Sequence, residues 1–124
     1  MENIVEISKS IARSYSGAKT KFHIALFVDH DYNIITYAFN SKNCCAERNL
    51  ICYSIPHSKC NIVVLRIHKN SHGITIKSAQ PCAKCRQEII KLPRNVEYVE
   101  WSTENGFDKS KCCDIPFNSY TALN

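Results

Sequence analysis

Residues 45–48 read CAER and residues 81–87 read PCAKCRQ, and these two short stretches determine what the rest of the chain has to build. In the second stretch Cys82 and Cys85 are three positions apart, so a helix that begins there places both thiols on one side of its first turn. The positive end of the helix dipole favours thiolates at this position. A third thiol, from Cys45, completes a set of three ligands and predicts a zinc site.

Three protein ligands are typical of a catalytic zinc site, because the fourth position is left for water, whereas a structural site is normally closed by four. Glu47 stands two positions after Cys45, close to the metal along the chain but not needed as a ligand. We expect its carboxylate to carry protons between water and substrate. Cys44, next to Cys45 in the sequence, is the alternative third ligand, but the ligand-x-Glu spacing to Glu47 favours Cys45. A fourth ligand, Cys44 or Cys112 for example, would close the zinc site and make the protein a non-catalytic zinc-stabilised module. The offset of Glu47 favours the catalytic site.

Two arginines directly follow residues of the predicted site. A zinc ion with three thiolates carries a net negative charge, which makes its bound water less acidic, and a neighbouring cation offsets this effect. Arg48 follows Glu47 and Arg86 follows Cys85, so either guanidinium is placed to donate hydrogen bonds to a thiolate. Of the two, we favour Arg48.

With these residues in place, the chain resembles the cytidine deaminase superfamily, and within it the small free-nucleoside cytidine deaminases. Both family motifs are present, as residues 45–48 and residues 81–87. The resemblance implies a zinc-dependent hydrolase that removes the amino group from cytidine, deoxycytidine or an analogue. It also implies a three-layer α-β-α fold and a homo-oligomer, either a tetramer or a dimer.

Weaker similarities suggest substrate contacts. Residues 15–16 and 21–22 resemble a family segment whose phenylalanine packs near the substrate, which implies Phe22; a place in the core is the alternative for this ring. Asn40 resembles the asparagine that holds the ribose, and capping a turn is its alternative. The resemblance also assigns Ala46 to the substrate. Residues 115–117 resemble a segment that helps to close the pocket; there we favour a core role for Phe117.

Lys42 marks a departure from the family. It stands where the family has a glutamate that binds a sugar hydroxyl, and the loop from Asn43 to Cys45 is several residues shorter than the family's. Lys42 is therefore placed either to meet a phosphate or to lie solvated on a surface loop, and we favour the solvated lysine. A substrate that is a nucleotide, or a base within RNA or DNA, is the alternative to a free nucleoside.

The spacing of apolar residues predicts one α/β domain over residues 1–124. Apolar residues recur at helical spacing from Ile4 to Tyr15, and Gly17 is a plausible end of that helix. The remaining expected elements are strands at 22–28, 34–39, 62–67 and 96–101, helices at 46–53 and 81–92, and a strand near 107–112 that returns antiparallel. This order predicts a mixed sheet of about five strands with helices on both faces.

Composition and charge indicate the compartment and the binding partners to expect. Eight cysteines without a basic and then apolar leader indicate thiols that bind metal or do chemistry in a reducing compartment, so we expect a cytoplasmic protein. No apolar run reaches the roughly 20 residues of a membrane span. The net charge of +5 comes from scattered residues, with no basic run interleaved with aromatic residues, so the sequence gives nucleic acid no direct support. We interpret the five histidines as surface or turn residues.

Overall fold

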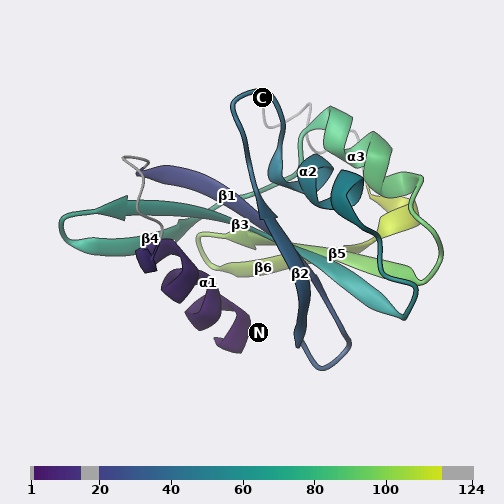
Figure 1. The fold of residues 1–124 in the computed structure, drawn as a ribbon, viewed down its shortest axis with the longest axis horizontal. Coiled ribbons are helices and arrows are strands. Elements are labelled where there is room, and N and C mark those ends of the chain that lie inside the picture. The colour runs from purple at the N-terminus through teal and green to yellow at the C-terminus, as the bar shows by residue number, and fades with distance from the viewer. Residues whose placement is uncertain (1, 15–19, 116–124) are drawn as a thin grey trace.

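The computed structural model of the protein describes residues 2–14 and 20–115. Within these residues, each of the three α-helices is followed along the chain by a pair of strands (Figure 1). The helices are α1 (Glu2–Ser14), α2 (Ala46–Tyr53), α3 (Ala83–Ile90) and a short 3-10 helix at Cys112–Asp114. The strands are β1 (Lys21–Val28), β2 (Ile34–Phe39), β3 (Cys60–Asn70), β4 (Gly73–Lys77), β5 (Val96–Thr103) and β6 (Gly106–Lys111).

All six strands belong to one mixed sheet with the order β2-β1-β3-β5-β6, and β4 pairs with β3. The β3–β5 pair is parallel, because α3 crosses over between these strands, and the other pairs are antiparallel. β5 pairs with the first part of β3 and β4 with its last part, so the β3–β4 hairpin projects beyond the helices α2 and α3 (Figure 1).

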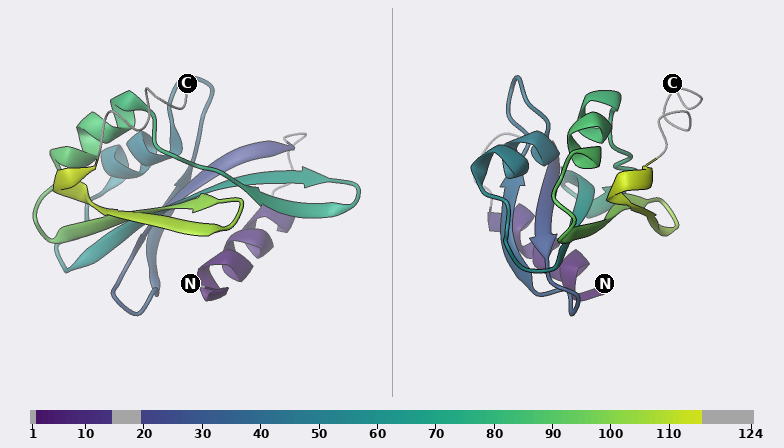
Figure 2. Two further views of the ribbon diagram at one scale, coloured as in Figure 1. Left: turned by 180° about the vertical axis from the view of Figure 1, so that it is seen from behind. Right: turned by 90° about the vertical axis from the view of Figure 1, so that its right-hand side faces the viewer.

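The sheet is covered on both faces, and each face has its own core (Figure 2). Strand alternation separates the two cores: Ala25 and Phe27 of β1 point toward α2 and α3, whereas Ile24 and Leu26 point toward α1. Leu50 of α2 and Ile89 of α3 are fully buried in the first core, and Ile4 and Ala12 of α1 in the second. This arrangement confirms the predicted three-layer α/β fold.

Two predicted elements have the observed bounds, the strand at Ile34–Phe39 and the helix at Ala46–Tyr53. β3 extends further than predicted and continues through a tight turn at Gly73 into β4, which the sequence analysis did not identify. Gly73 has φ of +131°, a conformation that side chains disfavour. The third helix ends at Ile90 rather than Leu92. The sheet therefore has six strands instead of about five, and the return of β6 antiparallel to β5 is confirmed.

Tyr15, Gly17 and Phe117, which the sequence analysis considered, lie outside the described residues. Ile115, the first residue of the family-like segment near the end, is buried in the core beside α3. Among the described helices, none has both the length and the apolar character that a membrane crossing requires.

Ser102 fixes the hairpin to β5. Its buried hydroxyl donates to the Lys77 carbonyl at 2.6 Å and accepts from the Arg66 N–H at 3.2 Å. Its own carbonyl accepts from the Ala79 N–H at 2.9 Å. Ser102 thus holds the end of β4 and the start of the segment that runs to Cys82.

Candidate metal centre

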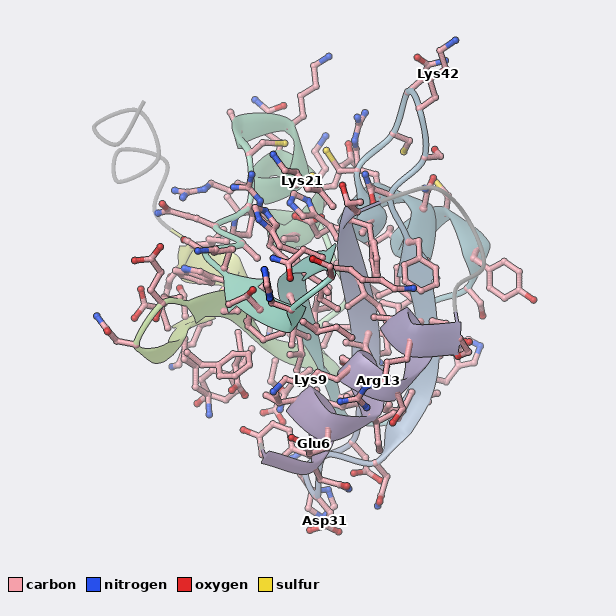
Figure 3. All side chains as sticks on the ribbon, turned by 90° about the vertical axis from the view of Figure 1, so that its left-hand side faces the viewer. Glu6, Lys9, Arg13, Lys21, Asp31 and Lys42 are labelled. Carbon is pink, nitrogen blue, oxygen red and sulfur yellow. The ribbon has the colours of Figure 1, made fainter. Side chains whose placement is uncertain are left out.

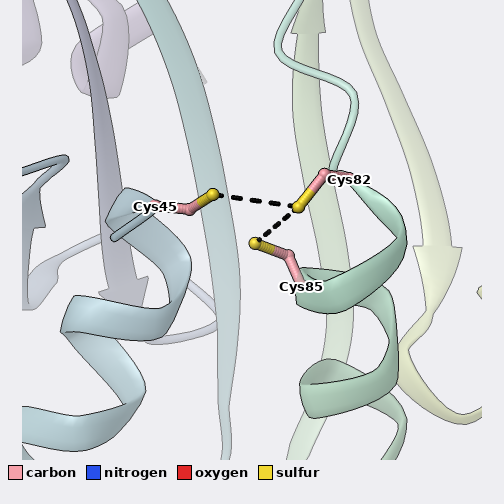
Figure 4. Close-up of side chains that lie close together, drawn as sticks. All are labelled: Cys45, Cys82 and Cys85. Atoms are coloured by element: carbon pink, nitrogen blue, oxygen red, sulfur yellow. Dashed lines mark hydrogen bonds between the residues drawn. The ribbon is translucent and has the colours of Figure 1, made fainter. Parts of the chain in front are cut away.

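Three thiols from two helix starts meet between α2 and α3 (Figure 4). Cys45 is the residue immediately before α2, Cys82 is the residue immediately before α3, and Cys85 lies in the first turn of α3. Cys45 Sγ lies 3.8 Å from Cys82 Sγ, which lies 3.3 Å from Cys85 Sγ. All three sulfurs lie within 4.8 Å of one another, so this cluster could hold a metal ion.

The separations fit a metal better than a disulfide. Sulfurs bound tetrahedrally to zinc at about 2.3 Å stand about 3.8 Å apart, whereas a disulfide requires about 2.05 Å. Cys82 and Cys85 are the C-x-x-C pair that the first helical turn brings together. Neither Cys44 nor Cys112 belongs to the cluster that the described residues form.

The cluster is partly buried, and its surroundings shift the pKa values of the three thiols in different directions. Burial raises the pKa of Cys45, and burial together with the negative charge of Glu47 raises the pKa of Cys85. Burial also acts on Cys82, but hydrogen bonds from the Cys85 N–H and with the Cys85 and Cys45 thiols outweigh it and lower the pKa of Cys82. Cys82 is therefore the most acidic of the three thiols.

Glu47 lies in the first turn of α2 and is only 3% exposed. Its Oε1 atom has no hydrogen-bond partner in the part of the chain that the structure describes. Burial raises the pKa of this carboxyl, while contacts with its own N–H, Cys85 and Arg48 oppose the rise. A buried carboxyl with an unused oxygen beside a thiol cluster is suited to hold and release a proton.

The two arginines take different positions. Arg48 forms a hydrogen bond with Cys45, and this bond, with the nearby thiols, holds the pKa of its guanidinium above the ordinary value. Arg86 is fully buried, and its Nε donates to the Pro81 carbonyl at 2.8 Å. Arg48 thus contacts a thiol, as we favoured, whereas the Arg86 Nε supports the backbone just before Cys82.

An open hollow of about 370 Å³ adjoins Cys45. Several of its lining residues are polar or basic, and it has no acidic lining residue; the lining consists of His23, Asn40, Ser41, Lys42, Asn43, Cys44, Cys45 and Arg48. Asn40 and Lys42, two predicted substrate contacts, therefore line the same hollow as Cys45, and Lys42 is exposed. A second hollow, of about 420 Å³, lies around the end of α3 and includes Cys112 but none of the three clustered thiols.

The other two predicted substrate contacts do not line the hollow beside Cys45. Phe22 is 2% exposed in the core on the α1 face, where its ring packs edge-to-face on Phe39 at 5.4 Å. Ala46 is buried in the opposite core, under the start of α2. Strand alternation explains the position of Phe22, because its neighbour His23 points to the face that carries the thiols.

His23 is a site residue that the sequence analysis did not single out. It lines the hollow, and its backbone is fixed to Asn40: the His23 N–H donates to Asn40 Oδ1 at 2.9 Å, and the Asn40 N–H donates to the His23 carbonyl at 3.2 Å. The sequence contained a signal for this position, because His23 is two residues before Ala25 and alternation in a strand places both side chains on the same face of the sheet.

Asn49 holds the loop between β2 and α2. Its side-chain amide donates to the Phe39 carbonyl at 2.8 Å and to Ser41 Oγ at 3.3 Å. Ser41 and Cys44 also pair through their backbones. These bonds set the position of Cys45 at the start of α2.

No protein-family model matches the chain, and no curated protein matches it. The functional assignment therefore depends on the thiol cluster, Glu47 and the hollow beside them.

Proposed function

We propose that this protein is a zinc-dependent hydrolase that deaminates a cytosine-type base, with cytidine, deoxycytidine or an analogue as the simplest substrate. The observation that carries the proposal is Glu47, a nearly fully buried carboxyl with an unpartnered oxygen beside three clustered thiols. A structural zinc site has no need for such a group, and burial of a carboxyl oxygen without a hydrogen-bond partner is costly. A proton carrier in a deaminase needs to be placed in this way.

Cys45, Cys82 and Cys85 would hold the zinc ion. When bound, zinc lowers the pKa of water toward neutrality and so supplies a nucleophile at physiological pH. Arg48, through its bond to Cys45, offsets part of the negative charge of the thiolates. Asn40 and Lys42 line the hollow in which the sugar of the substrate would lie.

Glu47 would move the protons. Its carboxylate accepts a proton as oxygen bonds to carbon 4 of the ring, and it passes this proton to ring nitrogen 3. It then transfers the second water proton to the amino group, the carbon–nitrogen bond breaks, and ammonia leaves. The net reaction consumes one water and converts the amino base to its keto form, without any change in oxidation state.

Glu47→Gln and Glu47→Ala provide the test. Both variants should retain zinc, because Glu47 is not one of the clustered thiols, and both should lose turnover of cytosine compounds by a factor of about 10² or more. Zinc content is measured by metal analysis and turnover by ammonia release over nucleosides, nucleotides and oligonucleotides. A zinc-loaded protein that leaves the whole panel unchanged contradicts the proposal, as does a fourth sulfur ligand in zinc-edge X-ray absorption.

A further inference from the structure

The face of the sheet that carries the thiols is not covered along its whole length. Beyond α2 and α3, the start of β1, the end of β3 and the end of β4 place basic side chains in two adjacent rows. His23, Arg66 and Lys77 are register partners in one row, and Lys21 and His68 are partners in the next. We call these five residues the basic strip.

All five side chains point to the same face of the sheet. Residues directly opposite in antiparallel strands share a face, and His23 and Arg66 continue the alternation of Ala25 and Val64, which lie in the core under α2 and α3. Figure 3 looks onto this part of the molecule, where side-chain nitrogens gather around Lys21. Lys69, in contrast, lies toward α1, where its Nζ donates to the Ala12 carbonyl at 3.3 Å.

No carboxylate on these strands offsets the charge, because β1, β3 and β4 contain no aspartate or glutamate. The charges are close enough to act on one another. Burial lowers the pKa of His68, and Arg66, Lys21 and Lys77 lower it further. Positive groups held close together in this way repel one another, and a bound anion would relieve that repulsion.

The strip is continuous with the candidate metal centre. His23 is at once a member of the strip and a lining residue of the hollow that contains Cys45, Lys42 and Arg48. Lys77 begins the segment that leads to Cys82. An extended anionic ligand on the strip would therefore reach the hollow that Cys45 lines.

We propose that the basic strip binds the phosphates of single-stranded nucleic acid and thereby delivers a cytosine-type base to the hollow beside Cys45. This inference rests on the proposed function, because the thiol site gives the base a reason to enter. A base can react at its amino group only when it is unpaired, which favours a single strand over a duplex. Three strands at a spacing of about 4.8 Å give the strip a width of about 10 Å, more than a single phosphate needs.

Arg66→Gln combined with Lys77→Gln tests the strip. Arg66 is exposed and Lys77 is half-buried, and neither side chain belongs to the thiol cluster. Affinity for a fluorescent oligodeoxycytidine of about ten nucleotides is measured by anisotropy across a salt series. Each lost phosphate contact should flatten the salt slope by about 0.7 and weaken binding about fivefold at 0.1 M salt, so the double variant should bind about 25-fold more weakly.

Lys59→Gln combined with Lys91→Gln is the matched control. Both lysines are exposed: Lys59 lies just before the start of β3, and Lys91 lies at the end of α3. The control changes the net charge by as much as the Arg66 and Lys77 double variant does. The control should bind nearly as the parent does. Equal losses in both double variants would overturn the strip and leave only a net-charge effect, and equal affinity for duplex of the same sequence would also overturn it.

The failures of the two proposals are distinguishable. Turnover of free nucleosides without any oligonucleotide binding at low salt overturns the strip and leaves the deaminase intact. Oligonucleotide binding that depends on Arg66 and Lys77, without turnover of any cytosine compound, supports the strip as a binding surface and contradicts the deaminase. Faster turnover of an oligonucleotide than of deoxycytidine, lost in the Arg66 and Lys77 variant alone, supports both.

Discussion

Replacing Ser102 by alanine should destabilise the fold and loosen the metal centre at the same time. The hydroxyl forms two hydrogen bonds, at 2.6 Å to the Lys77 carbonyl and at 3.2 Å to the Arg66 N–H, and Ser102 is fully buried. Each bond contributes about 1 kcal/mol net, so the free energy of unfolding should fall by about 2 kcal/mol. For a chain of this size, each kcal/mol corresponds to roughly 4 °C in Tm.

The measurement is urea unfolding of the metal-free protein followed by circular dichroism, so that zinc does not contribute. Ser110→Ala is the control, because the Ser110 hydroxyl lies on the edge strand and donates to the adjacent Lys111 carbonyl at 3.0 Å. Its loss should change stability by less than about 0.5 kcal/mol. Zinc competition with a chromogenic chelator should show weaker binding to Ser102→Ala, since Ser102 anchors the segment that leads to Cys82. If Ser102→Ala unfolds within 0.5 kcal/mol of the parent, as expected of the control, the reasoning is refuted.

Three further predictions concern titration. The Tyr32 hydroxyl donates to Glu100 Oε1 at 2.7 Å, and burial, this bond and the charge of Glu100 raise the pKa of Tyr32 from 10.0 to about 12. The bond therefore stabilises the fold fully below pH 10 and is lost as the pH rises through about 12. Tyr32→Phe should remove a tyrosine transition near pH 12 from an absorbance titration and should cost about 1 kcal/mol at neutral pH. An unchanged titration would contradict the bond. The lowered pKa of His68 means that the unfolded chain takes up a proton first, so stability should fall as the pH drops below 6.5. Oligonucleotide binding should raise this pKa in an NMR titration, since phosphate offsets the charges of Lys21, Arg66 and Lys77, and a pKa that does not move would count against the basic strip.

Much of the fold follows from patterns that lie within one stretch of chain. The strand at Ile34–Phe39 and the helix at Ala46–Tyr53 were predicted with their observed bounds, because each has a clear period and a clear stop. β4 was missed because its alternation, with Ile74 and Ile76 packed toward α1, spans only a short and otherwise polar segment. Its existence depends on pairing with β3, which no local pattern encodes.

The candidate site likewise has features that short sequence spacings predict and features that depend on the pairing of distant strands. The spacing of Cys82 and Cys85 and the offset of Glu47 from Cys45 are local, and the structure brings these four residues together. The basic strip was invisible in the sequence because His23, Arg66 and Lys77 come from three strands and meet only through their register. Phe22 was assigned by likeness to a family segment, whereas strand alternation places its ring on the α1 face.

The thiols of the cluster are far apart along the chain, and this has a thermodynamic consequence. Cys45 and Cys82 are 37 positions apart, and the segment between them contains β3 and β4. An unfolded chain would lose about 4 kcal/mol of loop-closure entropy in bringing these residues together, whereas the folded sheet already holds them close. From this entropy difference, zinc should bind the folded chain about a thousandfold more tightly than the unfolded chain. By reciprocity, bound zinc should stabilise the folded arrangement of the central strands against unfolding.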